Sequence, residues 1–194
     1  MCMEDFGATA FACTPSYALY LGEAAKEAGV VDRLQLKVGI NGAEPWTDEM
    51  RRKIEELLNV NSFDIYGLCE ITGPGVALDC IHHKGMHVQE DYFYPEVLNP
   101  TDHTPCKDGE TGELVFTTLV KEGMPLLRYR TKDLTSIDHS TCECGRTLPR
   151  ISKFKGRTDD MKVIRGVNVF PTQVETALLS IGGGVAPHYM MIVD

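Results

Sequence analysis

The most constraining feature of this sequence is a strand pattern that occurs twice near its start, each time followed by a loop of small residues. Residues 34–40, LQLKVGI, alternate apolar and polar side chains as a half-buried strand does, and run into the loop NGAEPW. Residues 47–58 follow with a Thr suited to cap a helix and apolar residues at helical spacing. Residues 62–66 form a second short strand that ends in GLCEITGPG. Two such units predict an α/β sheet, in which ligands gather at the carboxyl ends of the strands.

The pattern changes further along the chain. A helix is predicted over residues 15–28, because a Pro stands at its first turn and a Gly follows its end. After residue 79 the sequence consists of short strand patterns separated by turn residues, which is typical of a β-rich subdomain. Residues 171–179, PTQVETALL, predict one more helix. We therefore expect three parts: an α/β part over 1–78, a β-rich subdomain over 79–155, and a small α+β unit beginning in 156–194.

Composition narrows the class of partner. The net charge of −9 disfavours nucleic acid, because binding to phosphate backbones depends on clusters of Lys and Arg. There is no run of about 18 apolar residues and no basic signal segment, so we expect no membrane partner and a cytoplasmic location. Seven cysteines in such a chain are expected to be thiols or metal ligands. The sequence stops at Asp194 directly after a strand-like apolar run, so we expect a fragment.

Three motifs carry residues suited to a nucleotide. YGLCEITGPG places a ring (Tyr66), a backbone without a side chain (Gly67) and a hard oxygen ligand for Mg²⁺ (Glu70) within five residues. PLLRYRTKDL supplies two arginines on one strand face and then Asp133, whose carboxylate can accept both hydroxyls of a ribose. KGRTDDMKVIRGVNVFP combines a basic, an acidic and a flexible element. Each motif alone also suits an ordinary turn or a surface ion pair worth about 0.2–1 kcal/mol.

The order of these motifs resembles that of the adenylate-forming enzymes that make acyl-CoA thioesters. The segments TPSYA, LKVGINGAEPWT, YGLCEITGPGVA, EDYFYPEV, TGELVFTTL, MPLLRYRTKDL and GRTDDMKVIRGVNVFPTQVE resemble the phenylacetate-CoA ligase family over nearly the whole chain. The resemblance implies the carboxyl part of the large domain, a mixed sheet with helices and a β-rich subdomain, followed by the start of the small C-terminal domain. It implies an AMP-forming activation of an aryl carboxylic acid by ATP and Mg²⁺, and then thioester formation with coenzyme A.

The resemblance also assigns nucleotide contacts in the first part of the chain. Tyr66 would pack on the adenine ring, with Gly67 next to it in the same motif. Ala43 and Glu44 would line the adenine pocket. Glu70 would bind Mg²⁺.

Further roles follow from the resemblance in the second part. Asp133 would bind the ribose hydroxyls, and Arg157 would approach the ribose and phosphate. Asp159 would be the hinge residue about which the C-terminal domain rotates between adenylation and thioester formation. Gly166 would lie in the loop that lines the pantetheine channel. One departure is Cys69, which stands where the family often has Ser or Thr, and a thiol is a weak hydrogen-bond donor.

A separate group of residues has the chemistry of zinc ligands. CECG places Cys142 and Cys144 one residue apart, and DCIHHKGMH supplies Cys80 and His87 earlier in the chain. Three thiolates and one imidazole make a closed tetrahedral zinc site, which would be structural because no position remains for water. The alternative is a set of buried thiols and surface histidines without a metal. Two other histidines of the same stretch, His82 and His83, are alternatives to His87.

Several alternatives remain at this point. The sequence lacks the Gly/Ser/Thr-rich loop and the adenylation lysine of the family, so the chain alone is expected to be inactive. The acyl acceptor could be an amine or a carrier protein in place of coenzyme A, or the chain could be a non-catalytic, zinc-stabilised interaction module. A homodimer is compatible with the resemblance. A pocket for the aryl group is expected near Tyr17, Tyr20, Ile71, Pro74 and Gly75, although the two tyrosines equally suit a helix core.

Overall fold

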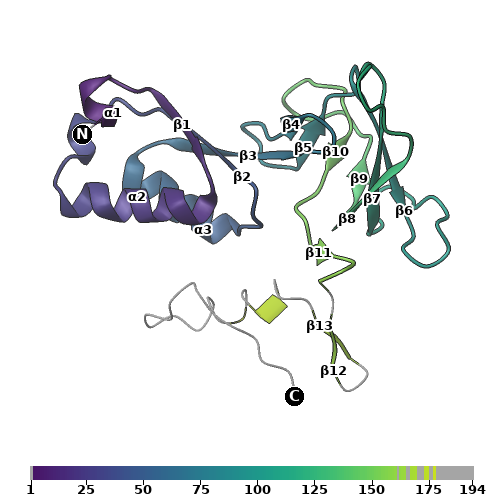
Figure 1. The fold of residues 1–194 in the computed structure, drawn as a ribbon. Helices are drawn as coiled ribbons and strands as arrows, with labels where there is room; N and C mark the ends of the chain where they lie inside the picture. Colours follow the sequence, from purple (N-terminus) through teal and green to yellow (C-terminus); the bar gives the residue numbers. More distant parts are fainter. Residues whose placement is uncertain (1, 161, 165–166, 170–172, 175–176, 178–194) are drawn as a thin grey trace. The chain divides into compact units, whose positions relative to one another are not determined.

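The computed structural model describes residues 2–160, 162–164, 167–169, 173–174 and 177 (Figure 1). The chain divides into two compact units. The first unit is Met1–Glu90 with His139–Ile151, and the second is Asp91–Asp138 with Ser152–Asp194. Residues 79–90 and 139–151, expected in the β-rich subdomain, group with the first unit because the strands β5 (Met86–Val88) and β10 (Arg150–Ile151) extend its sheet. The three-part division stays a prediction.

The first unit is a mixed sheet with helices, as expected. Its sheet has the strand order β1-β2-β3-β4-β5-β10. The pairs β1–β2 and β2–β3 are parallel, whereas β3–β4, β4–β5 and β5–β10 are antiparallel. In chain order its elements are α1 (Cys2–Asp5), β1 (Ala10–Cys13), α2 (Pro15–Glu27), a 3-10 turn (Val31–Arg33), β2 (Val38–Gly42), α3 (Asp48–Leu58), β3 (Asn61–Leu68), β4 (Gly73–Leu78), β5 (Met86–Val88) and β10 (Arg150–Ile151).

Both long helices begin at the residues that the sequence indicates. The Thr14 side chain accepts a hydrogen bond from the Tyr17 amide at the start of α2, and Thr47 Oγ1 accepts one from the Met50 amide at 3.1 Å at the start of α3. α3 ends at Leu58 and is followed by Asn59, which adopts the left-handed conformation with φ 53°. The predicted helices over 15–28 and 47–58 are therefore confirmed to within one residue at each end.

The core of the first unit lies where α2 and α3 pack on each other and on the parallel strands (Figure 1). The two helices approach closely because Gly22 of α2 faces Leu57 of α3: a Cβ at Gly22 would lie 2.8 Å from the Leu57 Cβ. Burying each large apolar side chain contributes about 1.5–3 kcal/mol. The buried core residues are Ala18, Ala25, Val30, Leu36, Trp46, Ile54, Leu58 and Val60.

The second unit is built on a four-stranded antiparallel sheet with the order β11-β8-β7-β6. Leu114, Val115 and Phe116 of its β7 strand are all buried. A separate hairpin is formed by β12 and β13. The elements of this unit are β6 (Phe93–Leu98), β7 (Gly112–Thr118), β8 (Tyr129–Thr135), β9 (Ile137–Asp138), β11 (Gly156–Arg157), β12 (Lys162–Ile164) and β13 (Val167–Val169).

Two predictions for the second unit concern residues that the structure describes only in part or not at all. The predicted helix 171–179 falls mostly outside the described residues, and Gly166 lies outside them.

Within the described part of the chain, no helix has the length and apolar character needed to cross a membrane.

Candidate functional site

The candidate nucleotide residues of the first unit lie at one edge of its sheet. β1, β2 and β3 run parallel, and the register pairs Asn41 with Asp64 and Gly42 with Ile65. Ala43 directly follows β2, and Tyr66 lies two residues before the end of β3. Both are therefore near the carboxyl ends of neighbouring parallel strands, where α/β sheets bind ligands. Ala43 is exposed and has a φ of 70°, which is uncommon for a residue with a Cβ.

The Tyr66-Gly67 pair marks an irregularity in the sheet. The register between β3 and β4 shifts between these two residues. A Cβ at Gly67 would collide with the backbone of Gly73 and Pro74, so this position needs glycine. Cys69 and Glu70 follow in the turn between β3 and β4, where both are exposed. An exposed carboxylate on such a turn is accessible to a hydrated Mg²⁺ ion.

The candidate residues of the second unit form one ion-pair cluster. The pairing of β11 with β8 places Arg157 opposite Asp133, and Arg157 Nη1 donates to Asp133 Oδ1 at 3.2 Å. The same guanidinium donates from Nε and Nη2 to the two carboxylate oxygens of Asp159, at 2.9 and 3.0 Å. These contacts lower the pKa of Asp159 below its usual value and raise the pKa of Arg157. The predicted ribose, phosphate and hinge residues are thus brought together.

The two arginines of the RYR motif do not share a strand face as expected, because Arg128 precedes β8 with a φ of 50° and only Arg130 lies in the strand. Both have acidic partners. Arg128 donates from Nε and Nη2 to the Glu96 carboxylate, both at 3.1 Å. Arg130 pairs with Glu113, whose side chain is only 1% exposed. Sequence reasoning did not identify these glutamates, because strand pairing alone brings them to the arginines from distant positions. Both arginines therefore pair with acidic residues of strands β6 and β7.

The four predicted metal ligands come together in the first unit. The donor atoms of Cys80, His87, Cys142 and Cys144 all lie within 4.8 Å of one another. Cys80 Sγ and Cys142 Sγ are 3.8 Å apart, and Cys144 Sγ lies 3.5 Å from His87 Nε2. A tetrahedral site with zinc–sulfur bonds of about 2.3 Å and zinc–nitrogen bonds of about 2.0 Å has ligand separations of roughly 3.5–3.8 Å. This donor set fits zinc.

The backbone around this cluster explains how it forms. The amide of Gly145 donates to the carbonyl of Cys142 at 2.9 Å, and Gly145 takes a φ of 85°, so the CECG segment closes a tight turn. The β5–β10 pairing places His87 opposite Arg150, close in sequence to that turn. His87 Nδ1 lies 3.4 Å from the Leu148 carbonyl, which leaves Nε2 to face the thiols. Burial lowers the pKa of His87 and favours the neutral imidazole that a metal requires.

The other two histidines of the same stretch pair with carboxylates. His82 Nδ1 lies 3.3 Å from Glu143 Oε2, and His83 Nδ1 lies 2.5 Å from Asp79 Oδ2. Asp79 in turn accepts the Cys80 amide at 2.7 Å, so the His83–Asp79 pair supports the loop that carries Cys80. Of the three candidate histidines, the donor set includes His87 alone.

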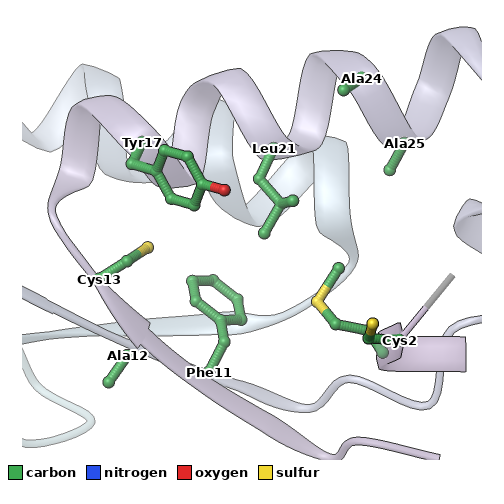
Figure 2. Close-up of a pocket in the computed structure, with 9 residues that line it drawn as sticks. Cys2, Phe11, Ala12, Cys13, Tyr17, Leu21, Ala24 and Ala25 are labelled. Carbon is green, nitrogen blue, oxygen red and sulfur yellow. The ribbon is translucent and has the colours of Figure 1, made fainter. Parts of the chain in front are cut away.

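An apolar pocket of about 430 Å³ lies elsewhere in the first unit. Figure 2 shows Tyr17 and Leu21 of α2 facing Phe11 and Cys13 of β1. Of the residues suggested for an aryl group, Tyr17 lines this pocket and the other four do not; Ile71 is fully buried. The lining residues are Cys2, Met3, Phe11, Ala12, Cys13, Tyr17, Leu21, Ala24 and Ala25.

Comparison with known proteins identifies relatives over the full chain. It is 50% identical to the phenylacetate-coenzyme A ligase of Thermus thermophilus, across 100% of this chain and 44% of the relative. It is 47% identical to the phenylacetate-coenzyme A ligase of Escherichia coli, across 99% of this chain and 44% of the relative. The chain thus spans less than half the length of these curated relatives. No protein-family model matches it.

Solved structures agree with this match. A 2-hydroxyisobutyryl-CoA ligase in the postadenylation state with 2-HIB-AMP superposes with a TM-score of 0.84 at 29% identity, covering 96% of this chain and 40% of that one. An anthranilate CoA ligase with anthranoyl-AMP shares the fold, with a TM-score of 0.65 at 17% identity over 91% of this chain and 35% of that one. The fold is that of the adenylate-forming CoA ligases, and the resemblance inferred from the sequence motifs is confirmed.

Proposed function

Because this chain is similar to the phenylacetate-CoA ligases, we propose that it forms part of an AMP-forming ligase that joins an aryl carboxylic acid to coenzyme A. The observation that carries the proposal is the 50% identity along the whole chain to the phenylacetate-coenzyme A ligase of Thermus thermophilus. The order of motifs in the sequence supports the same activity. A phenylacetate-like acid is the proposed substrate.

The proposed reaction has two steps. In the first, a carboxylate oxygen of the acid attacks the α-phosphorus of ATP, and pyrophosphate leaves as the acyl-adenylate forms. In the second, the sulfur of coenzyme A, having lost its proton, attacks the acyl carbonyl carbon, and AMP leaves with the electron pair of the broken carbon–oxygen bond. Both steps need negative charge on phosphate to be neutralised and the reacting groups to be held in place.

Several residues named by the resemblance are proposed to contact the nucleotide. Tyr66 packs on the adenine beside the loop that carries Ala43, and Asp133 accepts the ribose hydroxyls. Glu70 is the proposed ligand of Mg²⁺, which when bound would neutralise charge on the phosphates. The position of Glu70 on an exposed turn supports this role. The paired carboxylate of Asp159, two residues after Arg157, is the proposed hinge. Gly166 keeps its proposed place beside the pantetheine.

Pyrophosphate release by the full-length protein tests this proposal. With ATP, Mg²⁺ and phenylacetate, we expect release that depends on the acid and falls by at least about ten-fold in Asp133→Ala, which removes a charged hydrogen-bond partner. Adding coenzyme A should then release AMP; release that needs an amine or a carrier protein would indicate another acceptor. The isolated chain is expected to release none. Release by the full-length protein in the absence of any acid would contradict an acid ligase.

A structural zinc ion is the second part of the proposal. Cys80, His87, Cys142 and Cys144 would hold it, and their mutual distances support this assignment. Four protein ligands leave no open position, so the ion would stabilise the fold without taking part in the reaction. Zinc bound to a full-length protein that has no affinity for ATP would instead favour an interaction module. Metal analysis and calorimetry together separate these outcomes.

The cellular location and the oligomeric state of the protein are also proposals. A cytoplasmic location is proposed, and it is supported by the seven described cysteines, none of which forms a disulfide. The homodimer remains a proposal, and light scattering on the full-length protein measures it directly.

A further inference from the structure

Glu44 makes a contact that its predicted place in the adenine pocket does not explain. Its Oε1 accepts a hydrogen bond from the backbone amide of Ser16 at 2.6 Å. Ser16 is the second residue of α2, whereas Glu44 lies in the loop after β2. The carboxylate is half-buried. It therefore joins the loop at the end of one strand to the helix that follows the neighbouring strand.

This contact completes the N-terminus of α2. The first helical residue is Pro15, which has no amide hydrogen. The Ser16 amide is bound by Glu44, and the Tyr17 amide lies 3.4 Å from Thr14 Oγ1. The next amide, Ala18, donates to the Thr14 carbonyl at 2.9 Å. All donors of the first turn therefore have partners within the protein, and the negative charge of Glu44 lies at the positive end of the helix dipole.

The start of α2 lies where a phosphate could bind, so it matters whether its backbone amides are already bonded. Helix N-termini at the carboxyl ends of parallel strands commonly bind phosphate through free amides and the dipole. Here the amide that would serve is already bonded to a carboxylate, which would also repel a phosphate. The start of α2 is therefore not available to an anion.

The loop that Glu44 fixes contains a strained residue. Ala43, directly before Glu44, holds a φ of 70°, a conformation that costs of the order of a kcal/mol and persists only when its surroundings impose it. Gly42 is packed so closely that a Cβ there would lie 2.8 Å from Ile65 Cγ2. The packed Gly42 on one side of Ala43 and the anchored Glu44 on the other hold this conformation in place.

We propose that Glu44 is a positioning residue: it binds the start of α2 and thereby holds the backbone of residues 43–45 in the shape that receives the adenine ring. This inference rests on the proposed nucleotide site. In this inference the Glu44 carboxylate bonds to the protein itself, and the backbone of the loop faces the nucleotide. The nucleotide phosphates are then bound by groups other than the α2 N-terminus.

Hydrogen exchange in the full-length protein without any substrate tests the contact directly. In Glu44→Ala, amide exchange in the peptide covering residues 14–21 should quicken by about five-fold, as expected for the loss of one helix cap. Glu44→Gln keeps an oxygen acceptor and should restore most of the protection. The matched control is Glu49→Gln, which removes the same charge from an exposed position nearby and should leave exchange in this peptide unchanged. Unchanged exchange in Glu44→Ala would overturn the inference.

A thiol next to this contact gives a second readout. Burial and then the negative charge of Glu44 raise the pKa of Cys13. Alkylation of Cys13 by iodoacetamide, followed by peptide mass spectrometry, should be faster in Glu44→Gln than in the wild type, because the neutral amide no longer disfavours the thiolate. An equal rate in both proteins would mean that the carboxylate is not placed beside Cys13, and would contradict the inference.

Kinetics then separate positioning from direct binding. Glu44→Ala should raise KM for ATP by about ten-fold with little change in kcat, and Glu44→Gln should recover most of the loss. A raised KM without any change in exchange would mean that the carboxylate binds the nucleotide itself, and a changed exchange with normal KM would mean that the contact is only structural; both contradict the inference. The exchange and alkylation readouts need no activity, so a failure of the proposed ligase function is distinguishable from a failure of this inference.

Discussion

Arg157 binds both carboxylate oxygens of Asp159, at 2.9 and 3.0 Å, and with its remaining nitrogen contacts Asp133. One guanidinium thus joins the proposed hinge residue to the proposed ribose-binding residue. A bidentate geometry of this kind suits arginine and no other cation. The sequence places the three residues in separate motifs, and the pairing of β11 with β8 brings them together.

The ion pair between Arg157 and Asp159 should depend on pH in a defined direction. Because the pKa of Asp159 is lowered in the folded protein, the pair stabilises the fold above the usual aspartate value of about 3.9 and is lost as the pH falls through the lowered pKa. The melting temperature of Asp159→Asn should lie below that of the wild type at neutral pH, and the gap should close in acid. Asp32→Asn, an exposed control, should show no such gap.

Removal of the proposed zinc ion should destabilise the protein. Cys142 is 4% exposed, and Cys142→Ser replaces a buried soft ligand with a hydroxyl. We expect zinc content to fall from one ion per chain and the free energy of unfolding to fall by about 3 kcal/mol, or about 6–12 °C in melting temperature. His82→Ala should retain the ion. A Cys142→Ser variant with full zinc content would refute the assigned ligands.

The close approach of α2 and α3 depends on Gly22. A methyl group at this position would lie 2.8 Å from the Leu57 Cβ, so Gly22→Ala should destabilise the protein by about 1–3 kcal/mol through overpacking. Gly123→Ala is the matched control, because no atom lies within 4 Å of an added Cβ there. Urea unfolding measures both variants. Equal midpoints for the two would show that the helices separate without cost.

The two arginines of the RYR motif should differ in their effect on stability. Arg130 neutralises Glu113, which is 1% exposed, whereas Arg128 pairs with Glu96 at the surface. Arg130→Ala leaves a buried carboxylate without its partner and should lower the melting temperature much more than Arg128→Ala does. Thermal melts at neutral pH compare the two variants. A larger loss in Arg128→Ala would reverse this assignment.

Much of the first unit could be predicted from sequence, because its signals are local. Pro15 and Thr47 mark helix starts, and the alternation in LQLKVGI indicates a strand, although the structure places that strand later, at Val38–Gly42 instead of residues 34–40. The grouping of Cys80, His87, Cys142 and Cys144 also followed from residue chemistry. The sequence could not choose among three histidines, since that choice depends on partners such as Asp79 and Glu143 that only the folded loop brings close.

Long-range pairing explains what the sequence did not show. The contact of Glu44 with Ser16 requires β1 and β2 to lie side by side, and nothing in either motif indicates it. The pairing of Glu113 with Arg130 likewise depends on the register of β7 and β8. The sheet of the first unit recruits residues 139–151 because β10 pairs with β5, which no local pattern indicates.

The most direct test of the account is the identity of the products made by the full-length protein from ATP, phenylacetate and coenzyme A. Mass spectrometry and nucleotide chromatography should find phenylacetyl-CoA together with equal amounts of AMP and pyrophosphate, and Asp133→Ala should greatly reduce all three. Formation of ADP and phosphate in place of AMP and pyrophosphate, or the absence of a thioester with every aryl acid supplied, would contradict the proposed function.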